Sequence, residues 1–187
     1  KGSSTGNITV TATWKAKTYT VTLDKQSGTG GSSSVTATYG AAMPSATMPT
    51  RTGYTFAGYY DATSGGNMYY KADGASNKNW DKASSTTLYA RWTINQYDFT
   101  ISKGTGISKA YYQVGGTSGT WTEYTAAFKV NYGQTVYAYG TAATGYTSGT
   151  SASSPTSKAV STSGNSISLS ATLNKYKLTL TKGTGIS

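Results

Sequence analysis

The feature that most constrains this chain is an internal repeat. The stretch YDFTISKGTGIS at 97–108 returns as YKLTLTKGTGIS at 176–187, 79 positions further along. A weaker copy, YTVTLDKQSGTG, occupies 19–30, and its Tyr19 precedes Tyr97 by 78 positions. Self-similarity at a fixed period is typical of tandem repeat proteins, in which each copy is one structural unit.

The ends of the copies also match one another. GNITVTATW at 6–14 resembles GNSISLSATL at 164–173, and TTLYARW at 86–92 holds the equivalent place between them. We therefore expect the natural protein to be longer than this chain. The pattern predicts four segments: the last strand of a preceding repeat at 1–14, whole modules at 15–95 and 96–175, and the first strand of a following repeat at 176–187.

Apolar and polar residues alternate in short runs, which predicts β-strands. In the first run, Tyr19, Val21 and Leu23 share one face. Gly/Ser-rich turns are predicted between first and second strands at 28–34 and 113–120, and no run shows a helical period. Equivalent faces are predicted at Val35/Ala37/Tyr39, Leu88/Ala90/Trp92, Tyr97/Phe99/Ile101, Phe128/Val130/Tyr132, Ile167/Leu169/Ala171 and Tyr176/Leu178/Leu180.

Composition argues against an enzyme. The 187 residues include no histidine and no cysteine, so the commonest catalytic base and the strongest nucleophile are absent. The segment DGASNKNWD at 73–81 lacks the ligand spacing of a calcium loop and predicts a turn with Asx hydrogen bonds. KGTGIS at 103–108 lacks the order of a phosphate-binding loop and predicts a tight turn. We predict no catalytic residues, cofactor or metal site.

The net charge of +10 comes from 16 basic and 6 acidic residues. Such an excess favours polyanions such as nucleic acid, anionic glycans or wall polymers. The lysines are scattered rather than clustered, which is typical of solvated surface charge and argues against nucleic acid as a partner. No apolar stretch reaches the roughly 18 residues of a membrane span, and no signal peptide opens the chain. We predict no membrane insertion.

Aromatic residues gather in GYTFAGYYD at 53–61 and in the residues that follow. One hypothesis places Tyr59, Tyr60, Tyr69, Tyr70 and Trp80 on the surface, stacked on sugar rings. The other places aromatic side chains in the core, because a module of about 79 residues has a large burial demand. Alternation would direct one member of each Tyr-Tyr pair inward and the other outward.

A comparison with the second module helps to distinguish core residues from surface residues in this stretch. It repeats GYT at 145–147 but continues as SGTSASSP, without aromatic residues. GYT is therefore the shared structural signal, and FAGYYD is specific to the first module. We predict turns at Gly53 and Gly58 and core positions at Tyr54 and Phe56, which leaves Tyr59 or Tyr60 as the surface contact.

Residues 19–92 resemble a Listeria–Bacteroides repeat, the internalin-type B-repeat family. The resemblance rests on the opening YTVTL, the YG strand end, PTRTGYTFAGYY and the closing LYARW, with Tyr59 where the family usually carries Trp. Residues 96–175 resemble a divergent form through VNYGQTVYAYGTAATGYT and SISLSAT. The second module departs from the family pattern at 148–155, where SGTSASSP stands, so the two modules do not share the aromatic cluster.

The resemblance implies a mainly β fold of β-grasp-like small repeat modules with little helix, in a tandem elongated array. It also implies an extracellular or cell-surface bacterial protein without catalytic residues. The predicted function is a structural repeat that acts as a stalk or spacer, an adhesin body or a filament building block. The alternative is a module that binds a glycan or anionic wall polymer. Expected partners are neighbouring repeats, identical chains in a filament, or cell-wall polymer or glycan. The presence of Lys–Asn amide cross-links is a further hypothesis that the residues leave open.

Overall fold

The computed structural model describes residues 2, 6–7 and 9–180. The chain divides into two compact units, unit 1 at Lys1–Thr93 and unit 2 at Ile94–Ser187. The division lies close to the module boundary predicted at 95/96, but the assignment of each unit to one repeat stays a prediction. The described residues form strands, turns and loops and no helix, which agrees with the mainly β fold predicted from sequence. They therefore include no helix that could cross a membrane.

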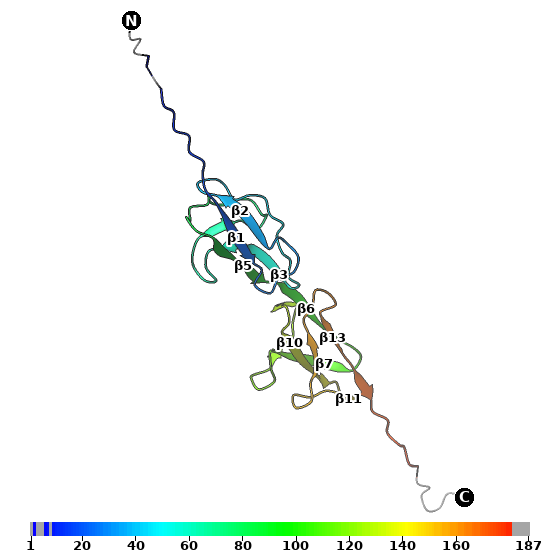
Figure 1. Cartoon of the computed structure of the whole chain (residues 1–187). Helices are drawn as coiled ribbons and strands as arrows, with labels where there is room; N and C mark the ends of the chain where they lie inside the picture. The colour runs from blue at the N-terminus through cyan, green and yellow to red at the C-terminus, as the bar shows by residue number, and fades with distance from the viewer. Residues whose placement is uncertain (1, 3–5, 8, 181–187) are drawn as a thin grey trace, which may run out of the picture. The chain divides into compact units, whose positions relative to one another are not determined.

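Unit 1 is built on one sheet with the strand order β2-β1-β5-β3-β4 (Figure 1). The first strand, β1, pairs antiparallel with β2 and parallel with β5, the last strand of the unit. The strands are β1 (Thr18–Asp24), β2 (Ser34–Thr38), β3 (Tyr54–Tyr60), β4 (Met68–Tyr70) and β5 (Thr86–Ile94).

The alternation predicted for β1 is confirmed. Val21 and Leu23 are buried, whereas Thr20 and Thr22 between them are exposed. In β5, Leu88 and Ala90 are buried by the same rule, because side chains in a strand point alternately to its two faces. The sheet therefore has one face on the unit 1 core.

Unit 2 contains three smaller sheets, with the orders β13-β6-β9, β12-β10-β7-β8 and β11-β14 (Figure 1). Phe99, Ile101, Ile167 and Leu169 fill its core at the predicted inward positions. The strands are β6 (Gln96–Lys103), β7 (Ile107–Val114), β8 (Thr122–Glu123), β9 (Phe128–Asn131), β10 (Thr135–Ala142), β11 (Tyr146–Ser148), β12 (Thr156–Ala159), β13 (Ser166–Leu169) and β14 (Ala171–Leu173).

The two units share a pairing pattern. In unit 2, β6 pairs antiparallel with β9 and parallel with β13, as β1 does with β2 and β5. The strand that carries GYT also has an equivalent neighbour, since β3 lies beside β5 and β11 pairs with β14, which follows β13. The first, second, GYT and last strands thus form one frame in both units.

Unit 2 departs from the prediction between its first and second strands. The Gly/Ser-rich segment 113–120 does not connect them directly, because β7 and β8 lie between β6 and β9. The segment overlaps the end of β7 and then forms the connection to β8. The predicted tight turn at 103–108 is confirmed, since β6 ends at Lys103 and β7 begins at Ile107. Its copy at 182–187 lies outside the described residues.

The described residues of the two end segments form no strand. Val10 and Trp14 are 87% and 94% exposed, and Tyr176, Leu178 and Leu180 are exposed as well. The assignment of 1–14 and 176–187 to neighbouring repeats stays a prediction. Residues 1, 3–5, 8 and 181–187 of these segments lie outside the described part.

Candidate functional site

The aromatic residues proposed as a surface contact are mostly core residues. The prediction of surface contact is wrong for Tyr59, Tyr69, Tyr70 and Trp80, whose side chains are 0% exposed. Tyr60 is half-buried and is the one member of the five that reaches solvent. Unit 1 uses these large side chains to bury apolar area, as the alternative hypothesis states.

A glycine inside β3 sets the position of Tyr59. Gly58 has φ +134°, and a Cβ on it would lie 2.5 Å from the Tyr70 carbonyl oxygen on β4. The prediction of a turn at Gly58 is therefore wrong, because the residue lies within β3 where β4 approaches closely. The register of the two strands shifts between Tyr59 and Tyr60. Gly53, with φ +78°, does lie in a turn, immediately before β3.

The buried rings contact one another along the sheet. Phe56 packs edge-on against Tyr59 at a centroid distance of 5.3 Å and against Trp92 at 5.4 Å. Tyr59 packs edge-on against Tyr70 at 6.2 Å. Edge-to-face pairs of this kind add to the energy of burial itself. Tyr54, predicted as core, is half-buried at the start of β3 beneath the Arg51 guanidinium, which lies 3.8 Å from its ring centroid.

Trp80 enters the core from a loop. The backbone N–H of Trp80 donates to the Ala41 carbonyl, and the backbone carbonyl of Trp80 accepts from the Gly40 N–H, both at 2.8 Å. These bonds hold the loop after β4 against the loop after β2. The indole then packs on the Tyr69 ring at a centroid distance of 5.3 Å. Both members of the Tyr69–Tyr70 pair are buried for this reason, contrary to the prediction that one points outward.

The tyrosine hydroxyls of this core differ in their partners. Tyr70 donates to the Pro44 carbonyl at 2.7 Å, and Tyr69 donates to Asp81 Oδ1 at 2.5 Å. The Tyr59 hydroxyl has no hydrogen-bond partner among the described residues. Burial raises the pKa of Tyr59 and of Tyr70 to about 12, so both stay neutral. A buried, unsatisfied hydroxyl is destabilising.

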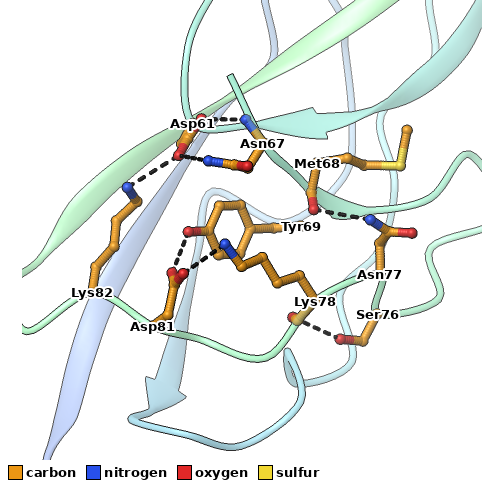
Figure 2. A network of polar contacts seen from close by, with 9 residues as sticks. All are labelled: Asp61, Asn67, Met68, Tyr69, Ser76, Asn77, Lys78, Asp81 and Lys82. Carbon is orange, nitrogen blue, oxygen red and sulfur yellow. Dashed lines mark hydrogen bonds and ion pairs between the residues drawn. The ribbon is translucent and has the colours of Figure 1, made fainter. Parts of the chain in front are cut away.

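A network of charged residues covers Tyr69. Figure 2 shows the Tyr69 hydroxyl and the Lys78 ammonium meeting at the Asp81 carboxylate, where Lys78 Nζ lies 2.6 Å from Oδ2. Burial first, and then the Asp81 carboxylate, raise the pKa of Tyr69. The hydrogen bond from Lys78, followed by that from Tyr69, lowers the pKa of Asp81. The carboxylate is therefore a structural partner of Tyr69.

A second carboxylate lies beside this network. Asp61 Oδ2 is 3.0 Å from Lys82 Nζ and accepts from Asn67 Nδ2 at 3.2 Å, and Asp61 Oδ1 accepts from Asn67 N–H at 2.7 Å (Figure 2). Burial favours the neutral acid, but the hydrogen bonds from Asn67 and Lys82 outweigh it and lower the pKa of Asp61 to about 2. The carboxylate is thus ionised.

This trio has the residue types of a Lys–Asn amide cross-link. Formation of that bond requires a neutral lysine amine to attack the asparagine side chain, with loss of ammonia, beside a carboxyl group that holds a proton. Asp61 is instead ionised and forms an ion pair with Lys82, whose side chain is 32% exposed. The geometry favours an ion pair, and a cross-link at this place stays untested.

Two further sequence predictions concern this region. The Ala75 N–H donates to Asp73 Oδ1 at 2.9 Å, which is the Asx hydrogen bond predicted for the turn at 73–81. Tyr60, the remaining candidate contact, lies beneath the Arg91 guanidinium, whose Cζ is 3.8 Å from the ring centroid. Arg91 also donates to the carbonyls of Ala62 and Gly65. The accessible face of Tyr60 is therefore partly occupied by the chain itself.

Unit 2 has an aromatic cluster that sequence reasoning did not single out. Tyr111 on β7 stacks on Tyr139 on β10 at 5.1 Å, and Trp121 meets Tyr139 edge-on at 4.8 Å. All three are half-buried. Tyr111 and Tyr139 pair directly across the strands, while neighbouring Ala110 and Ala138 point into the core. Alternation in YAYG at 137–140 was the signal that could have placed Tyr139 outward.

The comparisons relate part of unit 1 to a known repeat family. The model of the Listeria-Bacteroides repeat domain matches residues 19–91, from the second residue of β1 into β5. This part of unit 1 is therefore similar to a Listeria-Bacteroides repeat domain. The resemblance predicted for 19–92 is thereby confirmed. The match ends at residue 91, so the divergent repeat predicted at 96–175 stays a prediction.

Two relatives place this repeat in larger proteins. Internalin H of Listeria monocytogenes serovar 1/2a is 40% identical over 83 residues, 44% of this chain and 14% of that protein. A protein of Evansella cellulosilytica named "Putative membrane protein" is 31% identical over 120 residues, 60% of this chain and 16% of that protein. The second match is longer than either unit and so crosses the boundary at residue 93. The chain spans about a sixth of the length of these relatives.

Proposed function

We propose that this chain is a non-catalytic structural repeat of a bacterial cell-surface protein, where it acts as a stalk or spacer. The observation that carries the proposal is the burial of Tyr59, Tyr69, Tyr70 and Trp80. The aromatic signature of the repeat domain supports the fold of unit 1 instead of forming a ligand platform. A module whose most distinctive residues serve its own core is suited to a mechanical role.

The relatives support the surface location. One is an internalin and the other is named as a membrane protein, and each matches this chain over a small share of its own length. A repeat that is a minor part of a long surface protein fits a spacer between the cell and a distal domain. Tandem copies contribute unit and neighbour terms additively to the stability of such an array.

The carboxylates support a non-catalytic role. A general acid or base needs a carboxyl group that is available to a substrate. In the part of the chain that the structure describes, each of the six Asp and Glu side chains has a hydrogen-bond or ion-pair partner. Asp24 accepts from the Gln26 N–H, Asp61 pairs with Lys82, Asp73 accepts from the Ala75 N–H, Asp81 pairs with Lys78, Asp98 with Lys129, and Glu123 with Lys109.

The spacer role is tested in the full-length protein on the cell surface. Residues 15–175 are deleted, and in a second strain they are replaced by an unrelated rigid repeat of equal length. Accessibility of the distal end to an antibody is then measured. The proposal predicts that deletion reduces accessibility and that the unrelated repeat restores it. Failure of the unrelated repeat to restore it would contradict a spacer role.

A second candidate function is binding of a glycan or an anionic wall polymer, with the site in unit 2. The half-buried cluster of Tyr111, Tyr139 and Trp121 favours it, because aromatic rings stack on sugars. Titration of the chain with a glycan panel tests this function. Saturable binding that is lost on Trp121→Ala but kept on Tyr60→Ala would support it, and no saturable binding would dispose of it.

A further inference from the structure

We infer that each unit is a shear clamp, a fold that resists unfolding when the chain is pulled from its two ends. The inference follows from where the chain enters and leaves. It enters unit 1 through the first strand, β1, and leaves through the last strand, β5, and these two strands are parallel neighbours. Tension along the chain therefore acts on opposite ends of one paired ladder.

The ladder in unit 1 joins Val21, Thr22, Leu23 and Asp24 to Thr86, Thr87, Leu88 and Tyr89. Tension reaches β1 at Thr18, its amino end, and β5 at Ile94, its carboxyl end. Because the strands are parallel, the two forces point in opposite directions along the strands. The hydrogen bonds between them are loaded side by side and must break together.

Unit 2 has a comparable arrangement: β6 is its first strand, and its chain leaves through β13 and then β14, which pairs with β11. β6 and β13 pair in parallel from Thr100 opposite Ser166 to Lys103 opposite Leu169. Backbone bonds extend this ladder beyond the strands: Thr100 N–H donates to Asn165, Gly104 N–H to Leu169 and Ala171 N–H to Thr105, at 3.1, 2.8 and 3.1 Å. Two units of different sequence thus present the same load-bearing pair, even though unit 2 has added a four-stranded sheet.

Packing beneath the ladder strengthens the clamp. In unit 1, Val21 and Leu23 on β1 and Leu88 on β5 are buried in one cluster, with exposures of 0–3%. In unit 2, Ile101 on β6 and Leu169 on β13 are likewise buried in one cluster. Sliding of one strand past the other would move these side chains out of their packing positions, and close-packed interiors resist such displacement. Both the hydrogen bonds of the ladder and the packing of the core therefore resist shear.

The same geometry makes the fold weak when the two strands are pulled apart from the same end. If β1 and β5 are pulled apart from their amino ends, the ladder opens one pair at a time, as a zipper does. The fold and its free energy of unfolding are the same in both cases. Only the barrier to forced unfolding differs, because that barrier depends on the unfolding rate along the pulled direction.

The absence of cysteine makes a clean test possible, because the sequence offers no competing thiol. Handles are attached to the complete chain through introduced cysteines, and unfolding force is measured with single molecules. The shear variant carries Lys17→Cys and Thr93→Cys, before β1 and near the end of β5. The zipper variant carries Lys17→Cys and Ser85→Cys, before the amino ends of both strands. Lys17, Thr93 and Ser85 are exposed, so the core is unchanged.

We expect the shear variant to unfold at roughly twofold higher force or more, since the ladder pairs break together rather than in turn. Its length step should match release of the residues between the handles, at about 3.3–3.6 Å for each residue. Thermal unfolding without handles should be equal in the two variants, which excludes a difference in stability. Equal forces in the two variants, or a higher force in the zipper variant, would overturn the inference.

The biological meaning of the clamp rests on the proposed spacer role, because a spacer on a cell surface carries tension. The two ideas fail separately. Equal pulling forces would remove the clamp and leave the spacer experiment on cells unaffected. Failure of an unrelated repeat to restore accessibility would contradict the spacer role and leave the measured forces as they are.

Discussion

The two units solve the same burial problem with different residues. Unit 1 fills its core with Phe56, Tyr59, Tyr69, Tyr70 and Trp80. In unit 2, Phe99 is the only aromatic residue of the fully buried cluster among the described residues, and the other members are Ile, Val, Leu and Ala. The aromatic side chains Tyr111, Tyr139 and Trp121 of unit 2 are half-buried instead. Both cores nevertheless lie against the same frame of first, second and last strands.

The two cores differ in which elements supply their buried side chains. In unit 1, Phe56 and Tyr59 lie on β3, Tyr69 and Tyr70 lie on β4, and Trp80 reaches the core from a loop. In unit 2 the four-stranded sheet presents small residues such as Ala110, Val136 and Ala138 inward. The shared frame is therefore compatible with either kind of packing.

The largest expected effect concerns the buried tryptophan of unit 1 and the half-buried tryptophan of unit 2. Trp80→Ala should destabilise unit 1 by about 3–5 kcal/mol, because it removes a fully buried indole from the core. Trp121→Ala in unit 2 should cost about 1 kcal/mol or less, since its ring is half-buried. Denaturant unfolding, followed for each unit by resolved amide signals, measures both. Equal losses of unfolding free energy in the two units would contradict the difference between their cores.

A smaller effect tests the hydroxyls of the aromatic core. Tyr69→Phe should cost about 1–2 kcal/mol, because it removes a hydrogen bond to the Asp81 carboxylate. Tyr59→Phe should leave unit 1 unchanged or stabilise it by about 1 kcal/mol, because the Tyr59 hydroxyl is buried without a partner. The midpoint of thermal unfolding checks the two signs. A loss of stability in Tyr59→Phe as large as that in Tyr69→Phe would show that its hydroxyl is hydrogen-bonded after all.

A further effect concerns the acid stability of unit 1. The pKa of Asp61 falls from its ordinary 3.8 to about 2 in the folded state. A lowered carboxyl pKa stabilises the fold above its unfolded value, and this contribution disappears as the pH falls from about 4 towards 2. Unit 1 should therefore lose stability across that window. Asp61→Asn should be less stable at neutral pH but should change less within the window, and a parallel acid response in both proteins would contradict the role given to Asp61.

The smallest expected effect is no change at all. Because Asp61 is ionised and paired with Lys82, we expect no amide bond between Lys82 and Asn67. The intact mass of the protein should equal the mass of its sequence. Lys82→Arg, which cannot form the bond, is the matched control. A mass lower by one ammonia in the parent but not in Lys82→Arg would reveal the cross-link.

Sequence alone predicted the frame well, because the frame depends on alternation. Val21, Leu23, Leu88 and Ile101 all lie inward as the pattern indicates. The strands added in unit 2 were missed because Gly and Ser residues around 113–120 predict a turn, and that segment is indeed irregular after the end of β7. Nothing local to those residues shows that β7 and β10 pair along their whole length.

The candidate site was harder to predict, because burial of an aromatic residue depends on what covers it. Tyr69 and Tyr70 are neighbours in β4, and alternation directs them to opposite faces. Both are buried because the loop that carries Trp80 returns over Tyr69 and is held there by backbone bonds to Gly40 and Ala41. Those contacts join residues about forty positions apart, and the sequence pattern contains no signal for them.

The central claim is that the aromatic signature of unit 1 builds its core and is not a ligand platform. Calorimetric titration of the chain with a glycan panel and an anionic wall polymer, at physiological salt, tests it most directly, with Tyr60→Ala as the variant. The account predicts no saturable binding through unit 1, and any weak polymer attraction should vanish with added salt and be unchanged in Tyr60→Ala. Saturable, salt-resistant binding that is lost in Tyr60→Ala would contradict it.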